Sequence, residues 1–162
     1  LMVNTYASLE NERMMLYLDV EDRGILKKEH LIEDSVSVAA TLFQKLLAKG
    51  TEVGICVNLK TQDNLFYFKP SRTKDARRLL EQKLAEEWEE KDVLPFEKLL
   101  ECPFGDAIPV IISKNFSEKK KQFVEDFMGQ GTKGIWILPC EKGECPKVES
   151  DHFLFVKREV ER

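Results

Sequence analysis

The sequence has few of the residues that build common catalytic and metal sites. Its 162 residues include two histidines and four cysteines, and no glycine-rich loop joins a strand to a helix in the order that phosphate binding needs. No apolar run approaches the roughly 20 residues of a membrane-spanning helix. The formal net charge is −4, whereas a nucleic-acid binder usually carries a basic patch. These features argue against phosphate-loop chemistry and against nucleic acid as the main partner.

The two histidines also disfavour a Ser–His or Cys–His catalytic arrangement. His30 falls at the start of an expected helix and His152 at the start of an expected edge strand. Active residues of open α/β sheets gather instead at the carboxyl ends of the strands. Paired carboxylates are therefore the remaining candidates for acid–base work.

The four cysteines favour free thiols and an intracellular chain. Cys56 lies in an apolar strand pattern, where it acts as a small buried hydrophobe. Cys140 and Cys145 are separated by four residues, a spacing that also fits a bridged hairpin loop or two metal ligands. A structural zinc site needs four ligands at tighter, paired spacing. A zinc or redox role for Cys140 and Cys145, near Cys102 or His152, is thus the weakest of the functional hypotheses.

Hydrophobic periodicity predicts alternating strands and helices in one domain, residues 13–160, after an extended lead-in, residues 1–12. The pattern indicates a doubly wound α/β sheet that is mostly parallel, of the Rossmann-like kind, with one antiparallel edge strand. The expected strands are 14–20, 51–59, 65–69, 107–113, 133–138 and 152–156. The expected helices are 28–49, 73–89 and 117–128, with one or two further turns at 96–101.

Three details of the pattern make specific predictions about the second and third strands. The turn at residues 61–64 is too short for a crossover, so these strands are expected to be antiparallel. Pro70 is expected to end the third strand. Gly54, inside the second strand, is expected to let a neighbouring helix approach closely.

Acidic residues follow directly on the first buried strand. Asp19, Glu21 and Asp22 come after the apolar run MMLYL and precede the long helix. Because a ligand crevice in an open α/β sheet lies at the carboxyl ends of the strands, this cluster is the candidate site. In the simplest interpretation Arg23 or Lys114 pairs with these acids, since charges at a strand end are usually solvated or paired.

Four stretches resemble a bacterial family of unknown function whose C-terminal half is similar to a von Willebrand factor type A domain. They are residues 1–6 (LMVNTY), 15–19 (MLYLD), 36–42 (VSVAATL) and 50–54 (GTEVG). The family's genes commonly stand beside genes for MoxR-type AAA+ ATPases. The resemblance implies a type A fold and a protein partner of that ATPase class. It also implies a cytoplasmic domain whose full-length protein is anchored by membrane helices encoded before residue 1.

The same resemblance implies a site for Mg²⁺, which type A domains bind through an Asp-x-Ser-x-Ser motif, a threonine and a second aspartate. Asp19 matches the first aspartate and is the expected metal ligand, whereas Glu21 and Arg23 occupy the two serine positions. The second aspartate is replaced by the run Ser-Lys-Asn that ends at Asn115, and Ser71 or Thr73 stands in for the threonine. The implied metal site is therefore degenerate.

Two functional hypotheses from different classes follow. The first is a non-enzymatic interaction or adaptor module that contacts a MoxR-type ATPase without a required cofactor. Its contact surface is expected at Asp19, Glu21, Asp22, Ser71, Thr73 and Asn115. The second is a metal-dependent hydrolase that uses the acids after the first strand. A nucleophile or base beside those acids would favour the second hypothesis.

Overall fold

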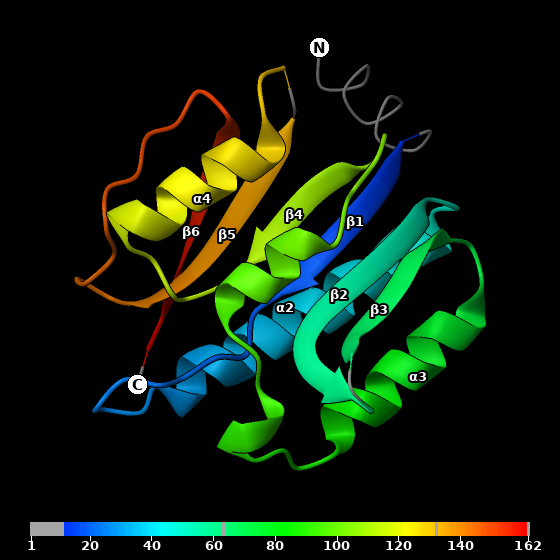
Figure 1. Ribbon diagram of the computed structural model, residues 1–162, viewed down its shortest axis with the longest axis horizontal. Coiled ribbons are helices and arrows are strands. Elements are labelled where there is room, and N and C mark those ends of the chain that lie inside the picture. Colours follow the sequence, from blue (N-terminus) through cyan, green and yellow to red (C-terminus); the bar gives the residue numbers. More distant parts are fainter. Residues whose placement is uncertain (1–11, 63, 132, 162) are drawn as a thin grey trace.

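The computed structural model describes residues 12–62, 64–131 and 133–161. Its sheet has six strands in the order β3-β2-β1-β4-β5-β6 (Figure 1). The strands are β1 (Arg13–Leu18), β2 (Glu52–Thr61), β3 (Asn64–Ser71), β4 (Ile108–Ile112), β5 (Gly134–Glu141) and β6 (Phe153–Val160). The helices are α2 (Glu29–Ala48), α3 (Lys74–Ala85) and α4 (Glu118–Met128), with 3-10 helices η1 (Glu90–Asp92) and η2 (Phe96–Glu101).

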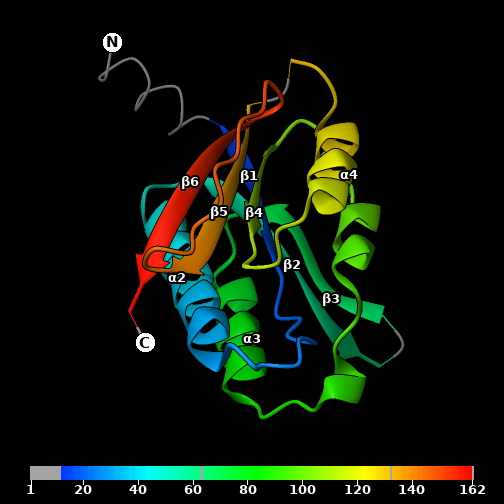
Figure 2. The same ribbon diagram turned by 90° about the vertical axis from the view of Figure 1, so that its left-hand side faces the viewer.

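The sheet is covered on both faces, as a doubly wound fold requires. Figure 2 shows α2 and α3 on one side of the strands and α4 on the other. Leu16 and Leu18 of β1 pack in the cluster that contains Ile32 and Phe43 of α2. The intervening Tyr17 packs in the second cluster, on the face that η2 and α4 cover. The near-continuous apolar character of β1 thus reflects burial on both faces.

The predicted fold class is confirmed at the level of an α/β sheet, mostly parallel, with one antiparallel edge strand. β1 runs parallel to both β2 and β4, and β2 runs antiparallel to β3. Ser117 caps α4, because its side chain accepts a hydrogen bond from the backbone nitrogen of Lys120. The predicted lead-in lies outside the described residues as far as residue 11.

The hairpin of β2 and β3 corrects two expectations. Pro70 does not end β3, which continues to Ser71, and an edge strand tolerates proline because the missing donor faces away from the sheet. Gly54 does face a close neighbour, but the neighbour is strand β3. A Cβ atom at Gly54 would lie 2.6 Å from the carbonyl oxygen of Phe68 and 2.6 Å from the nitrogen of Pro70.

Other boundaries also differ from the sequence interpretation. α3 ends at Ala85, so Trp88 packs against the core from beyond the helix. β5 extends to Glu141 and therefore contains Cys140, which was expected in a loop. β6 is the predicted edge strand and extends to Val160. Within the described ranges, no helix has the length and apolar character needed to cross a membrane.

Candidate functional site

Asp19 directly follows β1 and lies beside the carboxyl-terminal half of β2 and the end of β4. Leu18, the last residue of β1, stands in register with Val57 of β2 and with Ile112 of β4. Each of the three strands places a polar residue at the next position, namely Asp19, Asn58 and Ser113. All three side chains are fully buried. The parallel register therefore assembles a polar cluster from residues that are distant in the sequence.

The Asp19 carboxylate accepts four hydrogen bonds. Oδ1 accepts from Nδ2 of Asn58 at 2.8 Å and from the backbone nitrogen of Glu21 at 2.9 Å. Oδ2 accepts from Oγ of Ser113 at 2.5 Å and from Nδ2 of Asn115 at 2.9 Å. Since a carboxylate offers about four lone-pair sites, the donors within the protein satisfy this buried group.

The donors are themselves fixed by the backbone. The second hydrogen of Asn58 Nδ2 goes to the carbonyl oxygen of Leu94 at 2.9 Å, and Asn58 Oδ1 accepts from the nitrogen of Val20 at 2.8 Å. Asn115 Nδ2 also donates to the carbonyl oxygen of Glu21 at 2.7 Å. The cluster thus ties the loop after β1 to β2, to the loop after β4 and to the segment before η2.

Basic side chains pair with the other two acids of the predicted site, as the simplest interpretation of the sequence expects. Arg23 Nη1 lies 3.0 Å from Glu21 Oε2, and Lys114 Nζ lies 3.1 Å from Asp22 Oδ1. Lys114 and Asp22 are largely buried, with 9% and 13% of their side chains exposed. The positive charges needed beside the acids are therefore supplied by the chain.

Burial raises the pKa of Glu21 above its ordinary value of 4.5. The nearby Asp19 carboxylate raises this pKa further, while Arg23, Lys120 and a hydrogen bond from the backbone of Phe96 oppose the increase. The pKa of Glu21 is thus set by two opposing effects, burial, which raises it, and the partly exposed Arg23, which lowers it.

This pKa shift predicts how Glu21 affects stability with pH. A carboxyl group with a raised folded-state pKa favours folding fully below pH 4.5, and that contribution is lost as pH rises through the folded-state value. We expect Glu21→Gln, measured by urea unfolding over a pH series, to gain in free energy of unfolding relative to the parent as pH rises. Glu149→Gln, an exposed glutamate before β6, controls for the lost charge. A pH-independent difference for Glu21→Gln would contradict the assignment.

The donor set does not fit Mg²⁺ in this arrangement. Magnesium requires oxygen ligands in near-octahedral geometry, and the oxygens of Asp19 already accept four hydrogen bonds. Lys114 would place a positive charge next to an ion bound by Asp22. In the part of the chain that the structure describes, no group of three or more His, Cys, Asp or Glu residues could hold a metal ion.

Four of the six predicted site residues come together, and two do not. Asp19, Glu21, Asp22 and Asn115 lie at the carboxyl end of the parallel strands. Ser71 pairs with Val53 at the start of β2, and Thr73 stands two residues later at the N-cap position of α3, without a capping hydrogen bond from its side chain. Because β3 is antiparallel, its last residue lies at the amino end of the parallel strands. Ser71 and Thr73 therefore cannot substitute for the threonine of a type A metal site.

An acid-rimmed cleft of about 740 Å³ opens beside the loop after β1, between α2 and the end of α3. Apolar side chains line it, including Val20, Ile32, Val36, Leu84 and Trp88. Acidic residues also line it, namely Asp22, Glu29, Glu33, Glu86 and Glu87, and among the described residues Lys27 is the basic residue in the lining. In the same loop Ile25 and Leu26 are 102% and 75% exposed. Two adjacent aliphatic side chains thus project into solvent next to this cleft.

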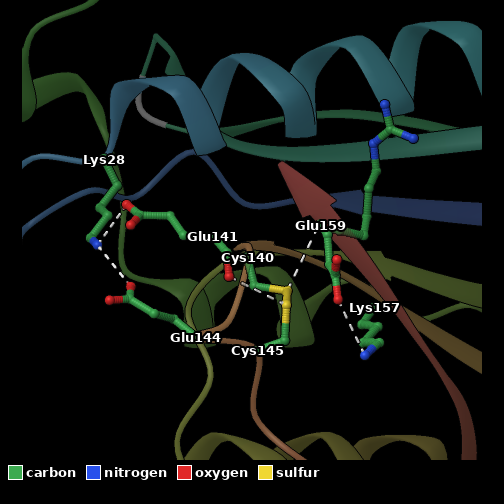
Figure 3. The surroundings of a disulfide bond; sticks show 8 residues. Lys28, Cys140, Glu141, Glu144, Cys145, Lys157 and Glu159 are labelled. Carbon is green, nitrogen blue, oxygen red and sulfur yellow. Dashed lines mark hydrogen bonds and ion pairs between the residues drawn. A yellow bond between two sulfur atoms is a disulfide. The ribbon is translucent and has the colours of Figure 1, made fainter. Parts of the chain in front are cut away.

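The structure corrects the expectation that all cysteines are free. Cys140 and Cys145 form a disulfide (Figure 3) with their Cα atoms 5.2 Å apart, so the bridged loop is the correct alternative for this pair. Nearby, Lys28 Nζ lies 2.8 Å from Glu141 Oε1 and 3.8 Å from Glu144 Oε2. Cys56 and Cys102 are free thiols.

The fold and this site define an open, doubly wound α/β domain with a hydrogen-bonded aspartate at its strand ends. Comparison with known proteins adds no closer assignment: no family model matches the chain, and no curated protein or solved structure matches it significantly. The von Willebrand factor type A assignment and the link to ATPases therefore stay predictions.

Proposed function

We propose that this domain is a non-enzymatic protein-interaction module with a type A-like fold, in which the Asp19 hydrogen-bond cluster takes the structural place of a metal site. The observation that carries the proposal is the saturated Asp19 carboxylate beside an exposed aliphatic loop. A site of this kind holds the strand ends rigid, while Ile25 and Leu26, 102% and 75% exposed, provide apolar contact area.

The chemistry of the surface specifies a partner surface that is apolar and basic. Five acidic side chains and one lysine line the cleft together with apolar residues, and complementary charge steers association and selects partners. By the resemblance described above, the partner is a MoxR-type AAA+ ATPase, and the module is a cytoplasmic domain of a membrane-anchored protein. No observation on the described residues favours the alternative of a metal-dependent hydrolase.

The proposal predicts that charge in the exposed loop abolishes partner binding. We expect the double variant Ile25→Asp, Leu26→Asp to bind a MoxR-type ATPase from the same organism at least about tenfold more weakly than the parent, since interface anchors commonly contribute more than 1 kcal/mol each. Its melting temperature should stay unchanged because neither side chain is buried. Biolayer interferometry on the purified domain and ATPase measures both affinity and its dependence on salt.

A matched control is Leu154→Asp, which places the same charge at a residue of β6 that is 63% exposed. This variant should bind like the parent protein. The proposed contact surface is wrong if the loop variant binds normally, and the proposed partner is wrong if the parent protein does not bind the ATPase at all.

A further inference from the structure

The two free cysteines face each other across the boundary between the sheet and η2. Cys56 is fully buried in β2, where it lies in register with Tyr17 of β1 and Tyr67 of β3. Cys102 follows the last turn of η2 and is half-buried. The Sγ atoms of the two residues are 3.1 Å apart. This separation is about 1 Å longer than a disulfide bond.

The backbone holds Cys102 over β2. The hydroxyl group of Tyr17 donates a hydrogen bond to the carbonyl oxygen of Cys102 at 2.7 Å. The nitrogen of Cys102 donates to the carbonyl oxygen of Leu99 at 3.1 Å. Closing the remaining gap needs only a small shift of Cys102, which lies at the end of a helical turn instead of inside the sheet.

We infer that Cys56 and Cys102 form a reversible disulfide when the protein meets a low-molecular-weight disulfide such as oxidised glutathione. The inference is independent of the proposed function, because it rests on the position of the two sulfur atoms alone. Nothing in it involves the bridge between Cys140 and Cys145.

The two residues have different roles in the exchange. The Cys102 thiolate attacks one sulfur of oxidised glutathione, so that a Cys102–glutathione bond forms and one glutathione thiolate leaves. The Cys56 thiol then loses its proton and attacks Cys102, and the second glutathione leaves as a thiolate. Both leaving groups take up the protons that the cysteines released. Two protein thiols are oxidised, and one glutathione disulfide is reduced to two thiols.

The electrostatics agree with this order of events. A hydrogen bond from the Cys56 thiol lowers the pKa of Cys102, whereas that bond and burial raise the pKa of Cys56. Nucleophilic attack requires the thiolate and access to the reagent. Cys102 has both properties to a greater degree, so it is the attacking residue and Cys56 the resolving one.

A disulfide between Cys56 and Cys102 would fix the second end of the segment of residues 94–102, which leads away from the Asp19 cluster. At its first end, the Leu94 nitrogen donates to the Asn58 carbonyl oxygen at 2.8 Å, and Nη2 of Arg23 donates to the Val93 carbonyl oxygen at 2.5 Å. Cys102 is the other end. Oxidation would therefore hold residues 94–102 on the sheet at both ends.

Peptide mapping after trypsin digestion tests the inference directly, because each cysteine lies on its own tryptic peptide. Cys56 is in residues 50–60, Cys102 in 99–114, Cys140 in 134–142 and Cys145 in 143–147. The full chain is incubated with oxidised glutathione, alkylated and digested without reduction. We expect a linked pair of peptides 50–60 and 99–114 that is two hydrogens lighter than their sum. Because the two cysteines are 46 positions apart in the sequence, the melting temperature should rise by roughly 5–10 °C.

Two variants make the result decisive. Cys102→Ser changes a half-buried residue and should fold, yet it should lose both the linked peptides and the thermal shift. The double variant Cys140→Ser, Cys145→Ser should keep both. The inference is overturned if Cys102 stays as a stable glutathione adduct, if it links to Cys140 or Cys145, or if neither thiol reacts.

Discussion

Replacing Asp19 by alanine is expected to lower the free energy of unfolding by about 3–5 kcal/mol. Removing a buried, hydrogen-bonded charged group leaves the donors that bind it without an acceptor. Three side-chain donors, from Asn58, Ser113 and Asn115, would lose an acceptor, as would the nitrogen of Glu21. Asp19→Asn should also destabilise the protein, since its amide group would face donors on one side. Urea denaturation with a linear extrapolation measures the difference.

A matched control and an ion titration separate this role from metal binding. Asp126→Ala removes an exposed aspartate that accepts one hydrogen bond from Gln122, and its effect should stay within about 0.5 kcal/mol. Mg²⁺, Mn²⁺ or Ca²⁺ should leave the stability of the parent protein unchanged. A working metal site would instead add about 2.7 kcal/mol when the ion is at about 100 times its Kd, and Asp19→Ala would abolish that gain.

Replacing Gly54 by alanine is expected to cost about 3 kcal/mol or more, at the upper end of the range for overpacking. The added Cβ would meet backbone atoms of three successive residues of β3, at 2.6 Å from Phe68 and Pro70 and 2.8 Å from Lys69. Backbone atoms in a paired strand cannot rotate away as the end of a side chain can, so β3 must move. Thermal unfolding by circular dichroism measures the loss, which should appear as a melting temperature lowered by roughly 10 °C.

Gly24→Ala is the matched control, because a Cβ at Gly24 would meet only the carbonyl oxygen of Leu26, at 3.4 Å. Its effect should stay within about 0.5 kcal/mol. If Gly54→Ala were as stable as Gly24→Ala, that result would contradict the close approach of the β3 backbone to Gly54.

Most of the fold could be predicted from the sequence, because the signals that define it are local. The apolar run of β1 and the three- and four-residue spacing of α2 each identify an element without knowledge of its neighbours. The four-residue turn at 61–64 was enough to make β3 antiparallel. The exact ends of β3, α3 and β5 were not predictable, since they depend on pairing and packing with segments elsewhere in the chain.

The candidate site could be predicted only in part, for a related reason. Asp19 was identifiable as a polar residue after an apolar strand, whereas Asn115 was identified through the resemblance to the type A metal motif. Asn58 was missed, and Ser113 was noted only as the first residue of the run Ser-Lys-Asn, although both follow apolar runs in the same way. The signal that would have found them is the register: once β1, β2 and β4 are aligned as parallel neighbours, the residues after Leu18, Val57 and Ile112 must meet.

The prediction of free thiols is confirmed for Cys56 and Cys102 and wrong for Cys140 and Cys145, for a different physical reason. Composition and the expected compartment favoured free thiols, whereas pairing of Cys140 with Cys145 depends on how β5 ends. Because β5 continues through Cys140 and the chain then turns at Lys142 and Gly143, Cys145 returns to within bonding distance. Sequence spacing alone left that return as one alternative among three.

The Asp19 cluster also constrains the order in which this chain acquires its final form. Its side-chain contacts join residues separated by 39, 94 and 96 positions, and such long-range contacts form late because loop closure must come first. In a chain emerging from the ribosome, the Asp19 carboxylate therefore exchanges water for its donors within the protein only after β4 and Asn115 have been synthesised and docked. The contacts of the cluster therefore form after the sheet is complete. They lower the unfolding rate more than they raise the folding rate.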